Sequence, residues 1–137
     1  MSVLQFDGYK VTSMEYHRNT NFETPKEQIT LDPKLKADHE VNDNHISVTL
    51  SLTVGSLTKK SIPFQVDCSV VGSFTYNPEE DKSEIGLDGF IRDNTVAILY
   101  PYVRAIIATL TTTSNEFPGY IMPTINVRQV LNQQNED

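Results

Sequence analysis

Hydrophobic side chains recur at every second position in two stretches, residues 46–54 and 62–76. The hydrophobic side chains are Ile46, Val48, Leu50, Leu52 and Val54, then Ile62, Phe64, Val66, Cys68 and Val70, continuing through Gly72 to Phe74 and Tyr76. A period of two places such side chains on one face of a strand, so the pattern predicts two strands that are each buried on one side. The stretch from Gly55 to Lys60 supplies the loop of a hairpin between them.

The residues between these hydrophobic positions are expected to form the opposite face of the same two strands. They are small and rich in hydroxyl groups: Ser47, Thr49, Ser51, Thr53, Gln65, Asp67, Ser69 and Thr75. Such a face can stay in water or meet the polar surface of a partner.

Two further strands are expected before this hairpin. Residues 4–19 mix apolar and polar positions and predict a first strand, and residues 35–41 predict a second, more polar one. Between them, residues 21–34 contain two prolines and are expected to cross as an extended loop. The run Asn42-Asp43-Asn44 is a turn signal.

A different period begins after the acidic loop 77–82. Apolar residues recur at helical spacing at Val96, Leu99, Val103, Ile106, Ile107 and Leu110. Asp93 or Asn94 is the expected N-cap, and Pro101 implies that the helix either starts near Tyr100 or is kinked there. Residues 111–114 are expected to end this helix, because β-branched and hydroxyl side chains are poor helix formers.

A second, short helix is expected near the C-terminus. Asn126 is a suitable cap, Val127, Val130 and Leu131 would form its apolar side, and residues 132–137 would be frayed. Strands followed by helices indicate a single α+β domain over residues 1–137. The expected fold is a four-stranded antiparallel sheet with one long helix packed on one face and a short C-terminal helix.

The charge balance and the cysteine count narrow the possible functions. The net charge is −7, and no cluster of Lys and Arg is present, which argues against nucleic-acid binding. Cys68 is the single cysteine, so no intrachain disulfide can form and a reducing compartment is expected. The first residues do not resemble a signal peptide, and the apolar run 96–107 is broken by Pro101 and Arg104. A soluble cytoplasmic protein is expected.

No cluster of residues suggests catalysis, a metal or a cofactor. His17, His39 and His45 lie in three separate segments without ligand spacing to a Cys or carboxylate. Cys68 is in phase with the buried positions of its strand, and the six glycines are scattered rather than gathered in a phosphate-binding loop. The sequence therefore favours a binding protein over an enzyme.

Four elements, in order along nearly the whole chain, resemble the SecB family of export chaperones. The segment Ile98-Leu-Tyr-Pro-Tyr-Val-Arg104 is similar to the start of that family's long helix. Phe117-Pro118, Pro123 and Ile125-Asn126 are similar to its loop into the second helix. Phe22-Glu-Thr-Pro25 is similar to the element that follows the family's first strand. Gly72-Ser-Phe74 is similar to the turn-forming second half of the family's sequence.

The resemblance implies a chaperone that binds unfolded or presecretory polypeptides without ATP, as a tetramer built from two dimers. The apolar groove for these client polypeptides would be lined by Phe22, Ile29, Leu31, Tyr120, Ile121, Met122, Ile125, Val130 and Leu131. An edge strand would form the dimer, and the long helices would pack dimer against dimer. Their interface would include Arg104, Thr109, Thr112 and Thr113.

The family also docks the SecA translocation motor through carboxylates on the open sheet face. Glu23 and Asp67 match two of them, whereas a third corresponds to Asn19, and Pro123 lies one position earlier than the family's proline. The C-terminal region is also short. These departures leave open an alternative: a SecB-like chaperone dedicated to one partner, such as an antitoxin, without SecA docking.

Overall fold

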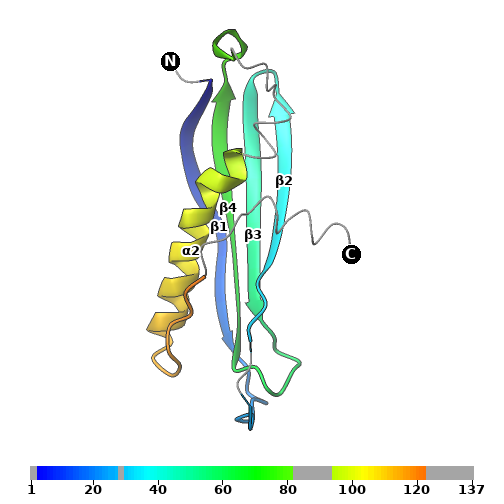
Figure 1. Cartoon of the computed structure of the whole chain (residues 1–137), viewed down its shortest axis with the longest axis vertical. Coiled ribbons are helices and arrows are strands. Elements are labelled where there is room, and N and C mark those ends of the chain that lie inside the picture. The colour runs from blue at the N-terminus through cyan, green and yellow to red at the C-terminus, as the bar shows by residue number, and fades with distance from the viewer. Residues whose placement is uncertain (1–2, 28–29, 82–93, 123–137) are drawn as a thin grey trace.

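A computed structural model describes residues 3–27, 30–81 and 94–122 of the chain. The strands are β1 (Leu4–Arg18), β2 (Lys34–Asn42), β3 (His45–Gly55) and β4 (Phe64–Tyr76), followed by a 3₁₀ turn, η1 (Pro78–Glu80), and the helix α2 (Val96–Thr113). The strands form one antiparallel sheet in the order β1-β4-β3-β2. β2, β3 and β4 follow one another as hairpins, and residues 19–33 cross from the β1 edge to the β2 edge (Figure 1). The expected four-stranded antiparallel sheet with one helix packed on it is confirmed.

The two hairpins differ in their connections. Asp43 and Asn44 form the two-residue turn that the sequence predicted, and Asp43 has a positive φ of 57°. Gly55 ends β3 with a φ of 93°, and a side chain there would collide with the backbone of Phe64. β4 begins at Phe64, two residues later than the alternation indicated. Pro63, which has no N–H to donate, precedes it, and the carbonyl groups of Ile62 and Pro63 accept hydrogen bonds from Asn19.

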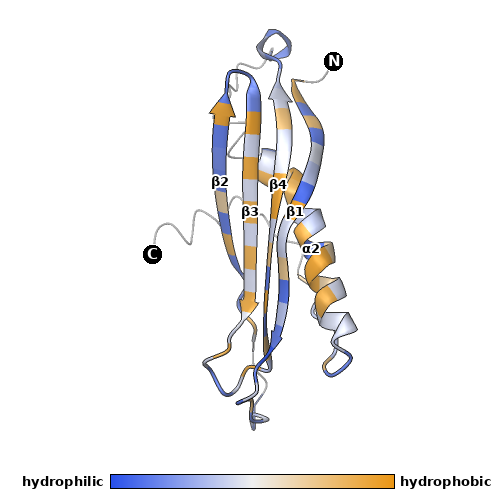
Figure 2. Ribbon diagram, turned by 180° about the vertical axis from the view of Figure 1, so that it is seen from behind, coloured by the Kyte–Doolittle hydropathy of each residue, from blue (hydrophilic) through white to orange (hydrophobic). Residues whose placement is uncertain are grey.

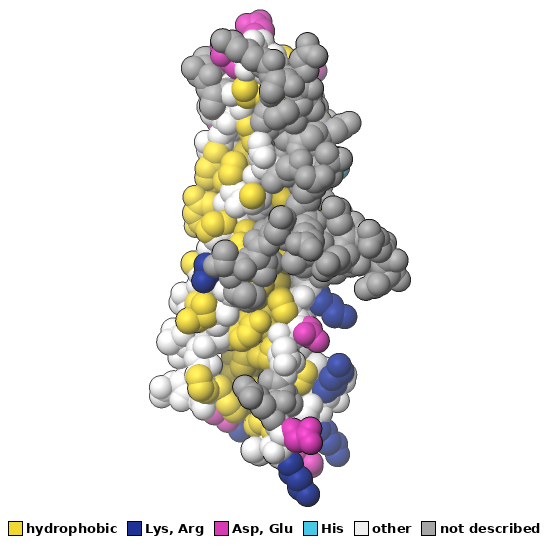
Figure 3. Space-filling model, viewed as in Figure 1, with side chains coloured by type: hydrophobic (Ala, Val, Ile, Leu, Met, Phe, Trp, Pro, Cys, Tyr) yellow, Lys and Arg dark blue, Asp and Glu magenta, His cyan; other side chains and the backbone are white. Residues whose placement is uncertain are grey.

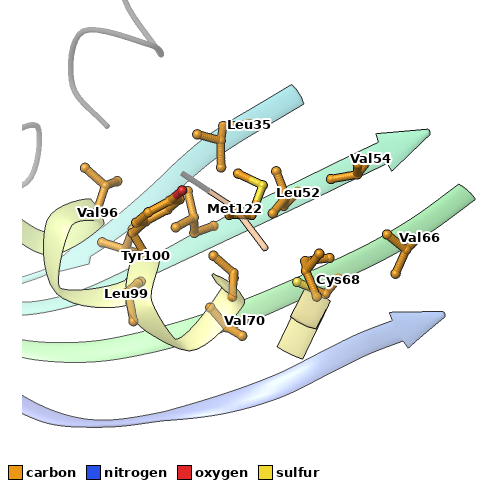
Figure 4. Close-up of a cluster of buried hydrophobic side chains, with 14 of the residues drawn as sticks. Leu35, Leu52, Val54, Val66, Cys68, Val70, Val96, Leu99, Tyr100 and Met122 are labelled. Carbon is orange, nitrogen blue, oxygen red and sulfur yellow. The ribbon is translucent and has the colours of Figure 1, made fainter. Parts of the chain in front are cut away.

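The core lies between the sheet and α2. Side chains of β3 and β4 largely alternate between buried and half-buried. Figure 2 shows the matching alternation of hydrophobic and less hydrophobic residues along both strands. Val96, Leu99, Val103 and Ile107 are the buried apolar side chains of α2 at the predicted spacing, whereas Ile106 and Leu110 are half-buried. Gly72 allows the close approach of helix and sheet, since a Cβ atom there would lie 2.6 Å from Leu99 Cδ2. Figure 4 shows the resulting cluster.

α2 begins before Tyr100, which was one of the two starts that the sequence allowed. Asn94 and Thr95 form a π-helical turn before Val96, so a start near Tyr100 is wrong, and Pro101 lies inside the helix. The prediction of Asn94 as N-cap is also wrong: the capping position is Thr95, whose side chain makes no capping hydrogen bond, and Asp93 is outside the described residues. The helix ends at Thr113, within the predicted range.

By length and composition α2 could cross a membrane, with a mean hydropathy of 1.3. Its buried side, however, packs on β4 and β3 as part of the core. The second helix predicted from Asn126 lies outside the described residues.

β1 contains two irregularities that the sequence did not reveal. The pairing with β4 shifts between Phe6 and Gly8 and again between Val11 and Ser13, which leaves Asp7 and Thr12 as extra residues. Each extra residue resets the alternation by one position. As a result, Phe6, Tyr9, Val11, Met14 and Tyr16 all pair with residues of the core-facing set on β4. β1 therefore carries apolar side chains along one face despite its mixed sequence.

Candidate functional site

Two loops that are distant in sequence meet beside the lower end of the sheet. The crossover loop contributes Phe22, and the loop after α2 contributes Phe117. Their rings meet edge-on, with centroids 5.7 Å apart and planes at 88°. Phe117 also approaches Phe64 at the start of β4, with a centroid distance of 6.1 Å. These rings place the crossover loop against the loop that follows the helix.

The loop after α2 is held in place from inside the helix. Thr111 is buried in the last turn, and its hydroxyl donates to the carbonyl of Ile107 at 2.8 Å. The same oxygen accepts a hydrogen bond from the backbone N–H of Tyr120 at 2.8 Å. The Tyr120 hydroxyl in turn donates to the carbonyl of Leu31 in the crossover loop, at 3.4 Å. Burial raises the pKa of Tyr120, so this hydroxyl keeps its proton at neutral pH.

The structure separates the predicted groove residues into three groups. Phe22, Leu31 and Tyr120 are half-buried, and Ile121 is 67% exposed. Met122 is fully buried beside Leu35 and Leu52 in Figure 4, so the expectation of an accessible side chain there is wrong for the subunit. It fills the apolar face of the sheet beyond the edge of α2. Ile29, Ile125, Val130 and Leu131 lie outside the described residues.

Phe117 is a residue of this region that the sequence analysis left out of the groove. The signal was present, because Phe117-Pro118 was part of the family resemblance. We call Phe22, Leu31, Phe117, Tyr120 and Ile121 the loop surface. Figure 3 shows hydrophobic side chains gathered on the helix-bearing face, in its upper part and again down the middle of its lower half.

A second apolar region lies on β1. Tyr9, Val11 and Met14 occupy the core-facing side of the strand but are 41%, 40% and 58% exposed. Tyr9 stacks on Tyr102 of α2, with ring centroids 4.1 Å apart. We call Tyr9, Val11 and Met14 the edge surface. It is apolar surface that the subunit's own helix covers only in part.

The outer side of α2 carries the four predicted interface residues. Thr109, Thr112 and Thr113 are exposed and Arg104 is half-buried. Arg104 is the only charged residue between Val96 and Thr113. The Thr113 hydroxyl donates to the carbonyl of Thr109 at 2.7 Å, so it is satisfied within the helix. A solvent-facing helix side with so little charge is unusual for a surface that stays in water.

Of the two candidate docking carboxylates, Asp67 lies on the open face of the sheet, and Glu23 lies in the crossover loop. Asp67 accepts hydrogen bonds from Thr53 Oγ1 at 2.7 Å and from Gln65 Nε2 at 3.1 Å. Glu23 is exposed at the start of the crossover loop, and its backbone N–H donates to the carbonyl of Lys60 at 2.8 Å. Asn19, at the third position, is only 3% exposed. It belongs to the interior rather than to the open face.

The described part of the chain offers little reactive chemistry. Within residues 3–27, 30–81 and 94–122, no three His, Cys, Asp or Glu side chains converge as metal ligands would. Burial, with a smaller contribution from the charge of Asp67, raises the pKa of the Cys68 thiol to about 12. Cys68 is therefore a protonated core residue at neutral pH.

Comparison with known proteins agrees with this architecture. The profile of the family described as "Preprotein translocase subunit SecB" matches residues 10–137. The chain belongs to the SecB family. An uncharacterized protein of Methanocaldococcus jannaschii is 33% identical over 135 residues, covering 93% of this chain and 82% of that protein.

Two solved structures share the fold. A SecB-like chaperone of Mycobacterium tuberculosis, in complex with a ChAD peptide from the HigA1 antitoxin, superposes with a TM-score of 0.69 at 17% identity, over 89% of this chain and 90% of that one. A Streptococcus agalactiae protein of unknown function gives a TM-score of 0.52 at 15% identity, over 88% and 97% of the two chains. Family and fold together support a chaperone role for this member of the SecB family.

Proposed function

We propose that the chain is a cytoplasmic, ATP-independent holdase that binds unfolded or precursor polypeptides on the loop surface. The observation that carries this proposal is the apolar patch formed where the crossover loop meets the loop after α2. Ile121 is the most exposed of the large hydrophobic side chains in the described residues, at 67%. A single exposed apolar side chain is normal, but a contiguous apolar patch on a soluble protein often marks a surface that a partner covers.

The chemistry of the loop surface suits many different client sequences. Its members are aromatic and branched aliphatic side chains carried on loops, which can rearrange more easily than side chains on strands. Glu116 in the loop after α2 is paired with Arg18, whereas the crossover loop carries Glu23, Glu27 and Asp32 against a single lysine, Lys26. The charge of the crossover loop, together with the net charge of −7, would attract basic unfolded segments at low ionic strength.

The functional unit in this proposal is a homotetramer made of two dimers. A second copy would cover the edge surface on β1, and the outer side of α2, with Arg104, Thr109, Thr112 and Thr113, would pack against the other dimer. The support is that both regions are poor in charge yet exposed in the subunit. The mass in solution tests the assembly, since four subunits weigh four times 15.5 kDa.

The holdase activity is tested by mixing the protein with a slowly refolding denatured protein in the absence of nucleotide. We expect the wild-type protein to suppress light scattering from aggregation. Ile121→Asp should lose much of this effect, because a charge in the loop surface opposes apolar contact. Leu57→Asp is the matched control, since Leu57 is also exposed, at 37%, but lies in the β3–β4 loop. Unhindered aggregation beside an intact wild-type oligomer would sink the proposal.

A chaperone dedicated to one partner is the second candidate function. Two observations favour it: Asn19 replaces a docking carboxylate and is buried, and a protein of the same fold holds an antitoxin peptide. Delivery to SecA would depend on the two remaining carboxylates, Glu23 and Asp67. Pull-down with SecA and with a panel of unfolded proteins separates the candidates. Capture of many unfolded proteins supports the general holdase, and capture of a single partner supports the dedicated chaperone.

The open-face variant Asp67→Lys tests motor delivery separately. We expect it to weaken any binding of SecA while client capture stays at the wild-type level, because Asp67 faces away from the loop surface. Thr75→Lys, farther along the same face of β4, controls for added charge. Loss of both activities in Asp67→Lys would mean that the two faces are not independent.

A further inference from the structure

Asn19 uses all of its polar groups inside the protein. Its side-chain amide donates to the carbonyl groups of Lys59 at 2.9 Å and Ile62 at 2.8 Å, and its side-chain oxygen accepts from the backbone N–H of Asn21 at 3.1 Å. Its backbone N–H donates to the Pro63 carbonyl at 2.8 Å. Only a primary amide offers two donors and an acceptor in this arrangement.

These hydrogen bonds join two loops at the lower end of the molecule. Asn19 is the first residue of the crossover loop, and its partners Lys59 and Ile62 belong to the β3–β4 loop (Figure 1). One further hydrogen bond, from the backbone N–H of Glu23 to the Lys60 carbonyl, continues the same contact. The start of the crossover loop is therefore held on the β3–β4 loop by buried polar contacts, which are costly to break singly.

The same segment carries one side of the loop surface. The backbone N–H of Phe22 donates to the Asn19 carbonyl at 3.1 Å, which fixes a turn between them. Arg18, the residue before Asn19, pairs with Glu116 at 2.7 Å, and Glu116 precedes Phe117. The aromatic contact between Phe22 and Phe117 thus lies within three residues of Asn19 on one loop and next to an ion pair on the other.

We propose that Asn19 is a positioning residue for client binding: its amide holds the crossover loop so that Phe22 meets Phe117 at one end of the loop surface. This inference rests on the holdase function proposed above. It also gives the residue a role of its own, since a side chain whose amide is consumed internally presents nothing to a docking partner. A carboxylate at this position would face the carbonyl oxygens of Lys59 and Ile62 and could not donate to either.

The test compares Asn19→Asp and Asn19→Ala with the wild-type protein. We expect the dissociation constant for an unfolded client peptide to rise by about tenfold, the factor that about 1.4 kcal/mol produces. Backbone amides around residues 21–23 should exchange with deuterium faster, while the oligomeric mass stays unchanged. Asn19→Asp should recover part of its affinity at acidic pH, where the protonated carboxyl group can donate one hydrogen bond, and Asn19→Ala should not. Thr75→Val, which removes a hydrogen bond to Asp7 at the opposite end of β1, is the control and should bind client normally.

A double-mutant cycle distinguishes positioning from general stability. If Asn19 acts through the aromatic contact, the losses of affinity caused by Asn19→Ala and Phe117→Ala should be less than additive when combined. Additive losses, or wild-type affinity in both Asn19 variants, would overturn the inference and leave the holdase function standing. If the wild-type protein captures no client, the holdase function fails, and the positioning role fails with it.

Phe22→Leu keeps the inference testable if neither Asn19 variant folds. This change is made at a half-buried position and shortens the side chain that Asn19 is proposed to place. A reduced affinity for the client peptide supports the contribution of Phe22 to client binding on which the positioning role depends, and wild-type affinity contradicts the positioning role.

Discussion

The position of Cys68 on β4 determines both its burial and the pKa of its thiol. It lies on the core-facing side of β4 with 1% of its surface exposed, as its place in the alternation predicted. Burial in apolar surroundings disfavours the thiolate, and the charge of neighbouring Asp67 acts in the same direction. The alternation of side chains along β4 thus places Asp67 on the open face and Cys68 in the core.

The raised pKa of Cys68 leads to a prediction about stability in alkali. The unfolded chain releases this proton near a pKa of about 8.5, whereas the folded protein holds it up to about 12. The unfolded state therefore binds fewer protons between these values, and the free energy of unfolding should fall there by up to about 1.4 kcal/mol per pH unit from this group. Below this range the group should contribute no pH dependence.

Urea unfolding at pH 8 and pH 10 measures this effect for the wild-type protein and for Cys68→Ala. The variant loses the thiol contribution but keeps every tyrosine, so the difference between the two slopes isolates Cys68. The same wild-type protein should resist thiol reagents until it is unfolded. Equal pH slopes in the two proteins would contradict the assignment.

The alternation of buried and exposed residues predicts burial only within a regular strand, and it does not apply to loops. Met122 follows Tyr120 and Ile121 in a loop, and one of its neighbours is 67% exposed while Met122 itself is buried. The path is set by Thr111 and by Gly119, where a side chain would collide with Thr112. Neither contact leaves a period in the sequence. The exposed and buried members of the loop surface could therefore not be separated beforehand.

Among the elements, β3 and β4 were predictable and β1 was only partly so. β3 and β4 keep one register along their whole pairing, so every second residue reaches the core. β1 contains two shifts, at Asp7 and Thr12, and its apolar residues are consequently spaced by three and then two positions. Such spacing matches neither a strand nor a helix. Only the pairing with β4 shows that these residues share one face.

The packing of α2 on β4 depends on the small size of Gly72. A Cβ atom at this position would lie 2.6 Å from Leu99 Cδ2 and 2.9 Å from Phe74 Cε2. We therefore expect Gly72→Ala to lower the free energy of unfolding by about 1–3 kcal/mol, because the helix or the ring must move. Chemical denaturation measures this change.

A compensating substitution provides the control for Gly72→Ala. Leu99→Ala removes the atoms that an added methyl group would strike, at the cost of a cavity. In the double variant the methyl group fills part of that cavity, so the two losses should be less than additive. Strict additivity would show that Leu99 is not the side chain that restricts residue 72.

At the scale of the whole molecule, the sequence predicted the sheet and the helix but not which apolar surface stays open. Periodicity reports which side of an element is apolar, whereas exposure depends on how far the opposing layer extends. α2 packs mainly on β4 and makes fewer contacts with β1, the edge strand. The edge surface of Tyr9, Val11 and Met14 remains exposed for this reason, although it continues the core-facing side.

The edge surface gives the sharpest test of the proposed assembly. Met14 is 58% exposed in the subunit, so Met14→Lys should leave the fold of the subunit intact. In a dimer formed through β1, the new charge would be taken out of water without a partner, which opposes association. We expect the mass in solution to fall from four times 15.5 kDa to that of a smaller species, measured by light scattering coupled to gel filtration. Leu57→Lys adds the same charge on the β3–β4 loop and should keep the wild-type mass. If Met14→Lys keeps it too, the edge surface is not an interface between subunits.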